Sequence, residues 1–174
     1  MPEPRVKLVA GVLYPSGESF DGFDWFSWAV EELRALWGEP EFKGASVPFT
    51  RTDYYRGIAP NLSRRFVCFE GLFDAGGLPD WKKSAVAVEA KSRTPRIVNI
   101  DPGYIDGARL VLASTKDHAH RVYLRGGIFA EVTMRFRFGK WVPFDYTFPD
   151  FASGVYDEFL SGARTSWLKA PSRF

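Results

Sequence analysis

The sequence of 174 residues has a single cysteine, Cys68, and this scarcity excludes several kinds of site. One cysteine cannot form an intramolecular disulfide, and it cannot supply the thiolates of a multi-cysteine zinc site. The neighbouring Phe66, Val67 and Phe69 indicate that the thiol is buried in a core.

Long apolar runs are also missing. No apolar run approaches the roughly 20 residues that cross a bilayer, and the first residues lack the apolar segment of a secretory signal peptide. We therefore expect a soluble, cytoplasmic protein without a membrane partner.

Charge of one sign is not in excess either, because 23 Lys and Arg stand against 21 Asp and Glu, a formal net charge of +2. Proteins that bind nucleic acid through charge are usually far more basic, so nucleic acid is a possible partner but not the favoured one. Local clusters of Arg and Lys make a small anion the expected partner. The oligomeric state is left open.

The composition is otherwise that of a globular protein, with 45% hydrophobic and 17% aromatic residues. This length suits one domain over residues 1–174, and large aromatic side chains give such a domain a heavy core.

The hydrophobic pattern predicts the order strand, helix, strand, strand, helix, strand. The first helix shows an apolar face at three- and four-residue spacing, followed by Gly38, and Asp21 or Asp24 precedes it as a cap. The predicted strands are 6–15, 44–50, 62–73 and 96–100, and the helices are 20–38 and 78–93. This order is typical of ferredoxin-like folds, so we expect an α+β fold with a ferredoxin-like βαββαβ core.

Further strands are predicted at 108–115, 120–124, 128–138 and 140–146, as antiparallel hairpins that extend the sheet. A C-terminal helix from Phe151 to Ser161 is expected to stop near Gly162. In the last hairpin, Gly139–Lys140 is the expected turn, with Phe138 opposite Trp141.

A Gly-Gly pair separates two of these strands and predicts a two-residue turn at Gly126–Gly127. Arg125 then pairs with Ile128, and Val122 faces Glu131. A longer turn with a bulge would shift this register by one residue and send Glu131 to the other side of the sheet.

In the two-residue register, His118 and His120 share one side of the strand with Glu131 and Thr133, whereas Arg121 alternates away. Residues directly opposite one another point to the same side of a sheet. The register therefore predicts that imidazole, carboxylate and hydroxyl groups meet there.

This group suits acid–base chemistry or a metal. Two imidazoles two residues apart can share proton transfer or bind one divalent metal, so His118, His120 and Glu131 are candidate catalytic and metal-binding residues. Asp101 or Asp117 would approach from loops, and Asp101 is the fourth candidate catalytic residue. The alternative is that the histidines are ordinary surface turn residues.

The run Ser-Thr-Lys-Asp ends another strand. The hydroxyls of Ser114 and Thr115, the ammonium of Lys116 and turn amides form a small anion-binding set, with Arg121 as a further contact. The sequence contains no Gly-x-x-x-x-Gly-Lys-Ser/Thr loop, so a P-loop GTPase is disfavoured. An ordinary polar turn is the other interpretation.

Two more segments carry candidate ligand contacts. Asp-Pro-Gly within Asn99–Tyr104 predicts a turn that projects Asp101 from a strand end, and a buried Asn99 would need hydrogen-bond partners. Arginines beside the loop after Pro48 can clamp a phosphate or carboxylate. The candidate ligand-binding residues are Lys116, Ser114, Thr115, Asn99, Tyr104, Arg65, Arg121 and Thr133.

The stretches PFTRTDYY, RRFVCFE, VNIDPGYI, LVLASTKDHAHRVYL, GIFAE and YTFPDF together resemble a bacterial family of unknown function, DUF4416. The likeness covers nearly the whole chain, and members of the family are often labelled GTP-binding proteins. The family pattern has Glu-Met-Gly after the tyrosine pair, where this chain has Arg56–Pro60. The resemblance implies a family and no particular reaction.

The leading hypothesis is a small enzyme or sensor for a phosphorylated or nucleotide-like ligand. Its site would lie where Asp101, the Ser114–Asp117 turn and the two histidines converge, with His120 as the acid–base group. The alternative hypothesis is a non-enzymatic RNA-binding or protein-interaction module.

Overall fold

Ten strands form one sheet in the computed structural model, which describes residues 1–16, 20–49 and 61–173. The main path of the sheet is β10-β9-β7-β6-β1-β4-β2, with β3 on β4, β5 on β1 and β8 on β9, and neighbouring strands are antiparallel. The strands are β1 (Arg5–Pro15), β2 (Pro40–Lys43), β3 (Val47–Phe49), β4 (Leu62–Phe69), β5 (Phe73–Asp74), β6 (Asn99–Ile105), β7 (Arg109–Ser114), β8 (Val122–Arg125), β9 (Ile128–Arg137) and β10 (Lys140–Pro143).

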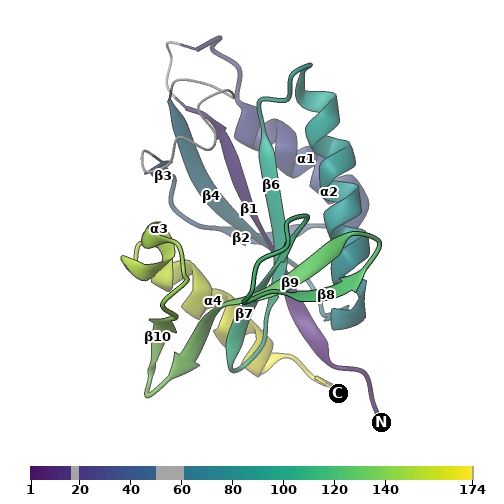
Figure 1. The fold of residues 1–174 in the computed structure, drawn as a ribbon, viewed down its shortest axis with the longest axis vertical. Helices are drawn as coiled ribbons and strands as arrows, with labels where there is room; N and C mark the ends of the chain where they lie inside the picture. Colours follow the sequence, from purple (N-terminus) through teal and green to yellow (C-terminus); the bar gives the residue numbers. More distant parts are fainter. Residues whose placement is uncertain (17–19, 50–60, 174) are drawn as a thin grey trace.

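Helices lie on both faces of the sheet (Figure 1). The helices are α1 (Trp25–Trp37), α2 (Leu78–Ser92), α3 (Pro149–Ala152) and α4 (Asp157–Lys169). Leu8 and Val12 of β1 pack in the core under α1 and α2, whereas Val9 packs in a second core with α4. Alternation along β1 thus supplies both cores, and the mixed α and β composition expected from the sequence is confirmed. In the described part of the chain, no helix has the length and apolarity needed to cross a membrane.

The first helix ends before Gly38 as predicted, but it begins at Trp25, after the second of the two candidate caps, rather than at residue 20. The Asp24 carboxylate accepts a hydrogen bond from the Ser27 backbone N–H, and Gly38 follows the helix with φ at 90°. Phe23 lies outside the helix, because it precedes the Asp24 cap, and its side chain is half-exposed.

The C-terminal helix differs from its prediction. A short α3 comes first, and α4 continues through Gly162 to Lys169. Gly162 does not end the helix. A Cβ atom there would lie 3.2 Å from the Phe42 ring, so the glycine serves close packing of α4 against β2.

The last hairpin also turns one residue earlier than predicted. Lys140 pairs with Arg137 and Trp141 with Phe136, so the turn residues are Phe138 and Gly139. Both adopt positive φ, at 52° and 76°. The tight turn is correct, but Phe138 is exposed rather than paired with Trp141.

The sequence predicted a turn at Asp101-Pro102-Gly103, and this prediction is wrong. The segment lies in the interior of β6. All of Asn99–Ile105 pairs with β1, whereas pairing with β7 begins only at Gly103. Proline has no backbone N–H to donate to a ladder, so it is tolerated where β6 leaves β7. The separation of the two strands opens a space beside the first residues of β6.

Gly103→Ala tests the close approach of β6 to β7. A Cβ atom at Gly103 would lie 2.2 Å from the Val111 backbone oxygen, so one strand must move. We expect the free energy of unfolding in urea to fall by about 1–3 kcal/mol. The control is Gly76→Ala, whose nearest neighbour is the Asp74 carboxylate at 3.2 Å. Equal stability losses in the two variants would contradict the packing argument.

Candidate functional site

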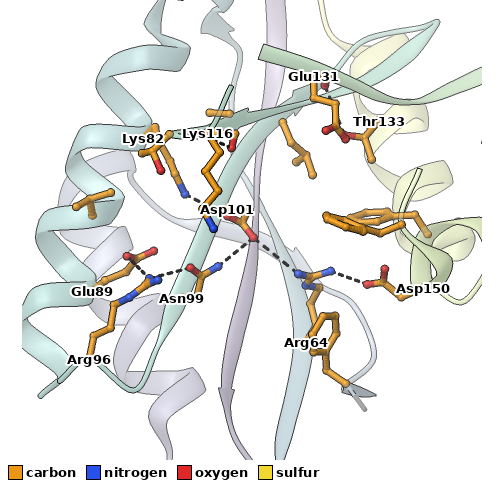
Figure 2. A pocket seen from close by; sticks show the side chains of 18 of the residues that line it. Arg64, Lys82, Glu89, Arg96, Asn99, Asp101, Lys116, Glu131, Thr133 and Asp150 are labelled. Atoms are coloured by element: carbon orange, nitrogen blue, oxygen red, sulfur yellow. Dashed lines mark hydrogen bonds and ion pairs between the residues drawn. The ribbon is translucent and has the colours of Figure 1, made fainter. Parts of the chain in front are cut away.

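A cleft of about 1180 Å³ lies where β6 leaves β7. Figure 2 shows α2 along one side and the Asp150 segment of α3 along the other, with Glu131 and Thr133 of β9 at one end. Small-molecule sites usually measure about 300–1,000 Å³, so the cleft accommodates a sizeable ligand.

Arg64 of β4 occupies the floor of the cleft. Its side chain is 5% exposed, its Nη1 lies 2.5 Å from Asp150 Oδ2 and its Nη2 lies 3.8 Å from Asp101 Oδ2. The guanidinium carbon is 4.5 Å from the Phe49 ring centroid and 5.6 Å from that of Phe151. A buried arginine is thus held by two carboxylates and two aromatic rings, which fixes its direction.

Arg65, the arginine predicted from the sequence, lies elsewhere. Its Nε donates to the Gly44 carbonyl at 2.6 Å and its guanidinium covers the Phe26 ring of α1, outside the cleft lining. Strand alternation places adjacent residues on opposite faces of the sheet. Arg64 and Phe66 are two residues apart in β4, so they point to the same face of the sheet. Arg64 could have been chosen from the sequence only if the face that carries the cleft had been known.

Side chains of α2 bind the backbone of β6 where β7 is not paired with it. Lys82 Nζ donates to the Ile100 carbonyl at 2.9 Å and to Asp101 Oδ1 at 3.1 Å. Glu89 Oε1 accepts the Ile100 N–H at 2.7 Å, and its Oε2 accepts from Arg96 Nη1 at 2.5 Å. The helix thereby satisfies polar groups that a neighbouring strand would otherwise pair.

Asn99 connects these ion pairs. Its Nδ2 donates to Asp101 Oδ2 at 3.0 Å and its Oδ1 accepts from Arg96 at 2.8 Å. The partners that a buried Asn99 was expected to need are therefore present. Together with Asp150 they form a continuous ion-pair network across the cleft floor (Figure 2), whose members are Glu89, Arg96, Asn99, Asp101, Lys82, Arg64 and Asp150.

The network shifts two pKa values in opposite directions. Burial alone would raise the pKa of Asp101, but the combined charges of Lys82 and Arg64 and the hydrogen bonds from Lys82 and Asn99 lower it below 3.8. Burial raises the pKa of Glu89, which the charge of Lys82 and the Ile100 N–H offset only in part. Asp101 is therefore the stably ionised carboxylate of the pair.

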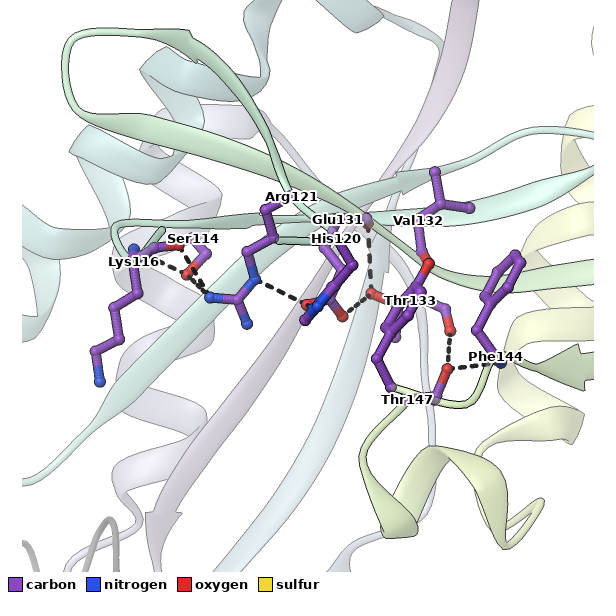
Figure 3. A network of polar contacts seen from close by, with 10 residues as sticks. Ser114, Lys116, His120, Arg121, Glu131, Val132, Thr133, Phe144 and Thr147 are labelled. Carbon is purple, nitrogen blue, oxygen red and sulfur yellow. Dashed lines mark hydrogen bonds and ion pairs between the residues drawn. The ribbon is translucent and has the colours of Figure 1, made fainter. Parts of the chain in front are cut away.

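A second set of contacts surrounds Glu131 (Figure 3). Its Oε2 lies 2.9 Å from His120 Nε2 and accepts from Arg121 Nε at 2.8 Å, while Oε1 accepts from Thr133 Oγ1 at 3.1 Å. The structure thus brings together His120, Glu131 and Thr133, as the hairpin reasoning anticipated. It adds Arg121 to the same carboxylate.

The register that led to this grouping is only partly correct. Arg125 pairs with Ile128 as predicted, but a bulge follows, so Val122 faces Ala130 instead of Glu131. Both histidines precede β8 in a turn rather than lying on the strand. Strict alternation therefore does not apply to Arg121, and it reaches Glu131 rather than pointing away.

The end of β7 is tied to the same arginine. Arg121 Nη1 donates to Ser114 Oγ and to the Lys116 carbonyl, both at 3.0 Å, and the Lys116 N–H donates to Ser114 Oγ at 3.1 Å. Lys116 extends into the cleft (Figure 2), and Thr115 also lines it. Burial and the nearby Arg121 charge lower the pKa of Lys116.

The remaining predicted residues are divided between the cleft and other places. His118 is exposed and lines the cleft, whereas His120 and Tyr104 are not among the described lining residues. Tyr104 packs against the core beneath α1 and α2. Residues 50–60, which include most of the tyrosine-rich loop and Arg56–Pro60, lie outside the described residues.

The expected metal ligands do not form a compact set. Within the described ranges, no group of three or more His, Cys, Asp or Glu side chains is placed to hold a metal ion. Glu131 instead accepts from Arg121, and His118 stacks on His120 at a centroid distance of 5.7 Å.

Asp101→Asn tests the ion-pair network through pH. We expect the free energy of unfolding to fall by about 1.5–3 kcal/mol near neutral pH, because Lys82 and Arg64 lose an ionised partner. Since the folded-state pKa lies below 3.8, the stabilisation by Asp101 is complete above that pH and is lost as pH falls through the lower folded-state value. Urea unfolding across acid pH should show the two stability curves converging. A gap that stays constant with pH would contradict the assignment.

A family model described as a domain of unknown function (DUF4416) matches residues 4–167. No curated protein and no solved structure shows a significant match to the chain. The family match includes every residue of the ion-pair network and of the Glu131 contacts, and it confirms the resemblance seen in the sequence motifs. The chain therefore belongs to the DUF4416 family.

Proposed function

We propose that the protein binds a small phosphorylated ligand in the cleft. The observation that supports this most directly is the charge of the cleft wall, where six basic side chains accompany four acidic ones among the described residues. The basic lining residues are Arg64, Lys82, Arg93, Arg96, Lys116 and Arg121, and the acidic ones are Glu89, Asp101, Glu131 and Asp150. A phosphate would balance the excess of positive charge.

The anion is expected at the end of β7. Lys116 and Arg121 both line the cleft there, and burial together with the nearby charge of Arg121 lowers the pKa of Lys116. An anion between them would relieve the repulsion between these like charges. The hydroxyls of Ser114 and Thr115 border the same place and suit phosphate oxygens.

Acid–base chemistry on the ligand is a further part of the proposal. Glu131 holds His120 by one ring nitrogen, an arrangement that orients an imidazole for proton transfer, and His118 is the histidine on the cleft wall. Asp101 is the carboxylate that Lys82 and Arg64 share on the cleft floor. These groups are the candidates for catalysis if the ligand is a substrate.

The core of the sheet is proposed to be ferredoxin-like. The strand order β6-β1-β4-β2 and the connections β1–α1–β2 and β4–α2–β6 support this assignment, because they reproduce the split βαβ pattern. On this interpretation the strands β7 to β10 extend the sheet from β6. The cleft then lies at the boundary between the core and its extension.

A protein-interaction module is the second candidate. β8 exposes apolar side chains on a short edge strand, with Val122 67% and Tyr123 57% exposed. Exposed strand edges are sites of strand addition. Light scattering over a range of protein concentrations tests self-association through this edge, and a monomer throughout would count against it.

Lys116→Ala tests anion binding. We expect calorimetry with inorganic phosphate or ribose 5-phosphate to show affinity reduced by about 10- to 100-fold, because one charge-assisted contact is removed. Lys116→Arg should retain most of the affinity. Lys140→Ala, at the exposed start of β10, is the matched control and should bind as the wild type does. Undetectable phosphate binding by the wild-type protein would refute the proposed function.

A further inference from the structure

Four rings contact one another in series beside the cleft. Phe144 and Tyr146 stack at a centroid distance of 5.2 Å with planes 3° apart, and Tyr146 stacks on His120 at 4.0 Å and 13°. His120 in turn stacks on His118 at 5.7 Å and 14°. We call this series the ring column, and its planes are nearly parallel throughout.

The inner rings of the column are fixed to β9. The Tyr146 hydroxyl donates to the Val132 carbonyl at 2.5 Å. Glu131 holds His120 through its Nε2 atom (Figure 3). Thr147 Oγ1 accepts from the Phe144 N–H and donates to the Thr133 carbonyl, both at 2.8 Å. Hydrogen bonds to β9 thus position Tyr146 and His120 within the column.

His118 differs from the inner rings because it is exposed and lines the cleft. The column thus ends in an aromatic ring that is open to the space in which the ligand is proposed to bind. Planar rings stack on such surfaces, and stacking is tolerant of ring identity because every base has a π-face.

The anion contacts lie in the same loop. Lys116 is two residues before His118, so their Cα atoms are at most about 7.6 Å apart. The loop is closed by the Arg121 N–H, which donates to the His118 carbonyl at 2.9 Å, and by Arg121 Nη1, which donates to the Lys116 carbonyl. The backbone of the ring contact and that of the anion contact are therefore close together, which suits a ring and a phosphate joined through one sugar.

We infer that the ligand is a nucleotide-like ring phosphate, whose planar ring extends the ring column by stacking on His118 while its phosphate contacts Lys116 and Arg121. This inference rests on the proposed anion binding and specifies the class of ligand. Ring and phosphate make separate contributions, because different side chains bind them.

Three probes separate the two contributions in calorimetric titrations. Adenosine 5′-monophosphate carries ring and phosphate, ribose 5-phosphate lacks the ring, and adenosine lacks the phosphate. We expect the monophosphate to bind about 5- to 100-fold more tightly than ribose 5-phosphate, the factor that corresponds to stacking of one base. His118→Ala should remove this advantage, so that the variant binds the monophosphate and ribose 5-phosphate with similar affinity.

Two further variants complete the test. His118→Phe keeps a ring at the end of the column and should preserve the advantage of the monophosphate. Phe138→Ala removes a ring that is 83% exposed at the β9–β10 turn and should change nothing. Equal affinity of the wild type for monophosphate and ribose 5-phosphate, or an unchanged advantage in His118→Ala, would overturn the stacking role and leave anion binding intact. Failure of both phosphates to bind would instead overturn the proposed function, and the inference with it.

Discussion

The departure of β6 from β7 at Pro102 is the constraint on which the cleft depends. One edge of β6 remains paired with β1, while at its other edge Ile100 has polar backbone groups that need partners. Lys82 and Glu89 of α2 supply these partners and bring two charges to the edge of the sheet. Those charges require counterions, which explains why Asp101 and Arg96 are close by.

Because the charged groups of the cleft floor are buried, each of them needs a particular partner. Charged groups that leave water must be paired and hydrogen-bonded, and removing one partner from a buried pair typically costs about 3–5 kcal/mol. Arg64 illustrates the point, because Asp150, Asp101 and two aromatic rings surround it. The floor of the cleft is therefore a preorganised surface, while Lys116 and His118 reach into the cleft from an exposed loop.

Much of the fold follows from local patterns. The spacing of apolar residues and the Asp24 cap predict α1. The hydrophobic pattern and the Gly-Gly turn predict β7 to β9. The site was only partly predictable, because it depends on which strand edges separate. Asp-Pro-Gly has a local turn preference, but pairing with β1 overrides it, so Asp101 lies within a strand. The grouping of His120 with Glu131 was predicted correctly from a wrong register. The bulge in β8 shifts the pairing by one residue, and the turn before β8 still brings His120 to Glu131.

Arg64 and Asp150 are separated by 86 positions in the sequence, yet they form one ion pair. A contact between such distant residues requires β4 and the segment of Asp150 to be brought together. The entropy lost on closing the long intervening loop makes contacts of this kind slow to form. The cleft therefore needs segments from both halves of the chain to be in place. A ligand that binds only this assembled cleft would stabilise the native state through mass action.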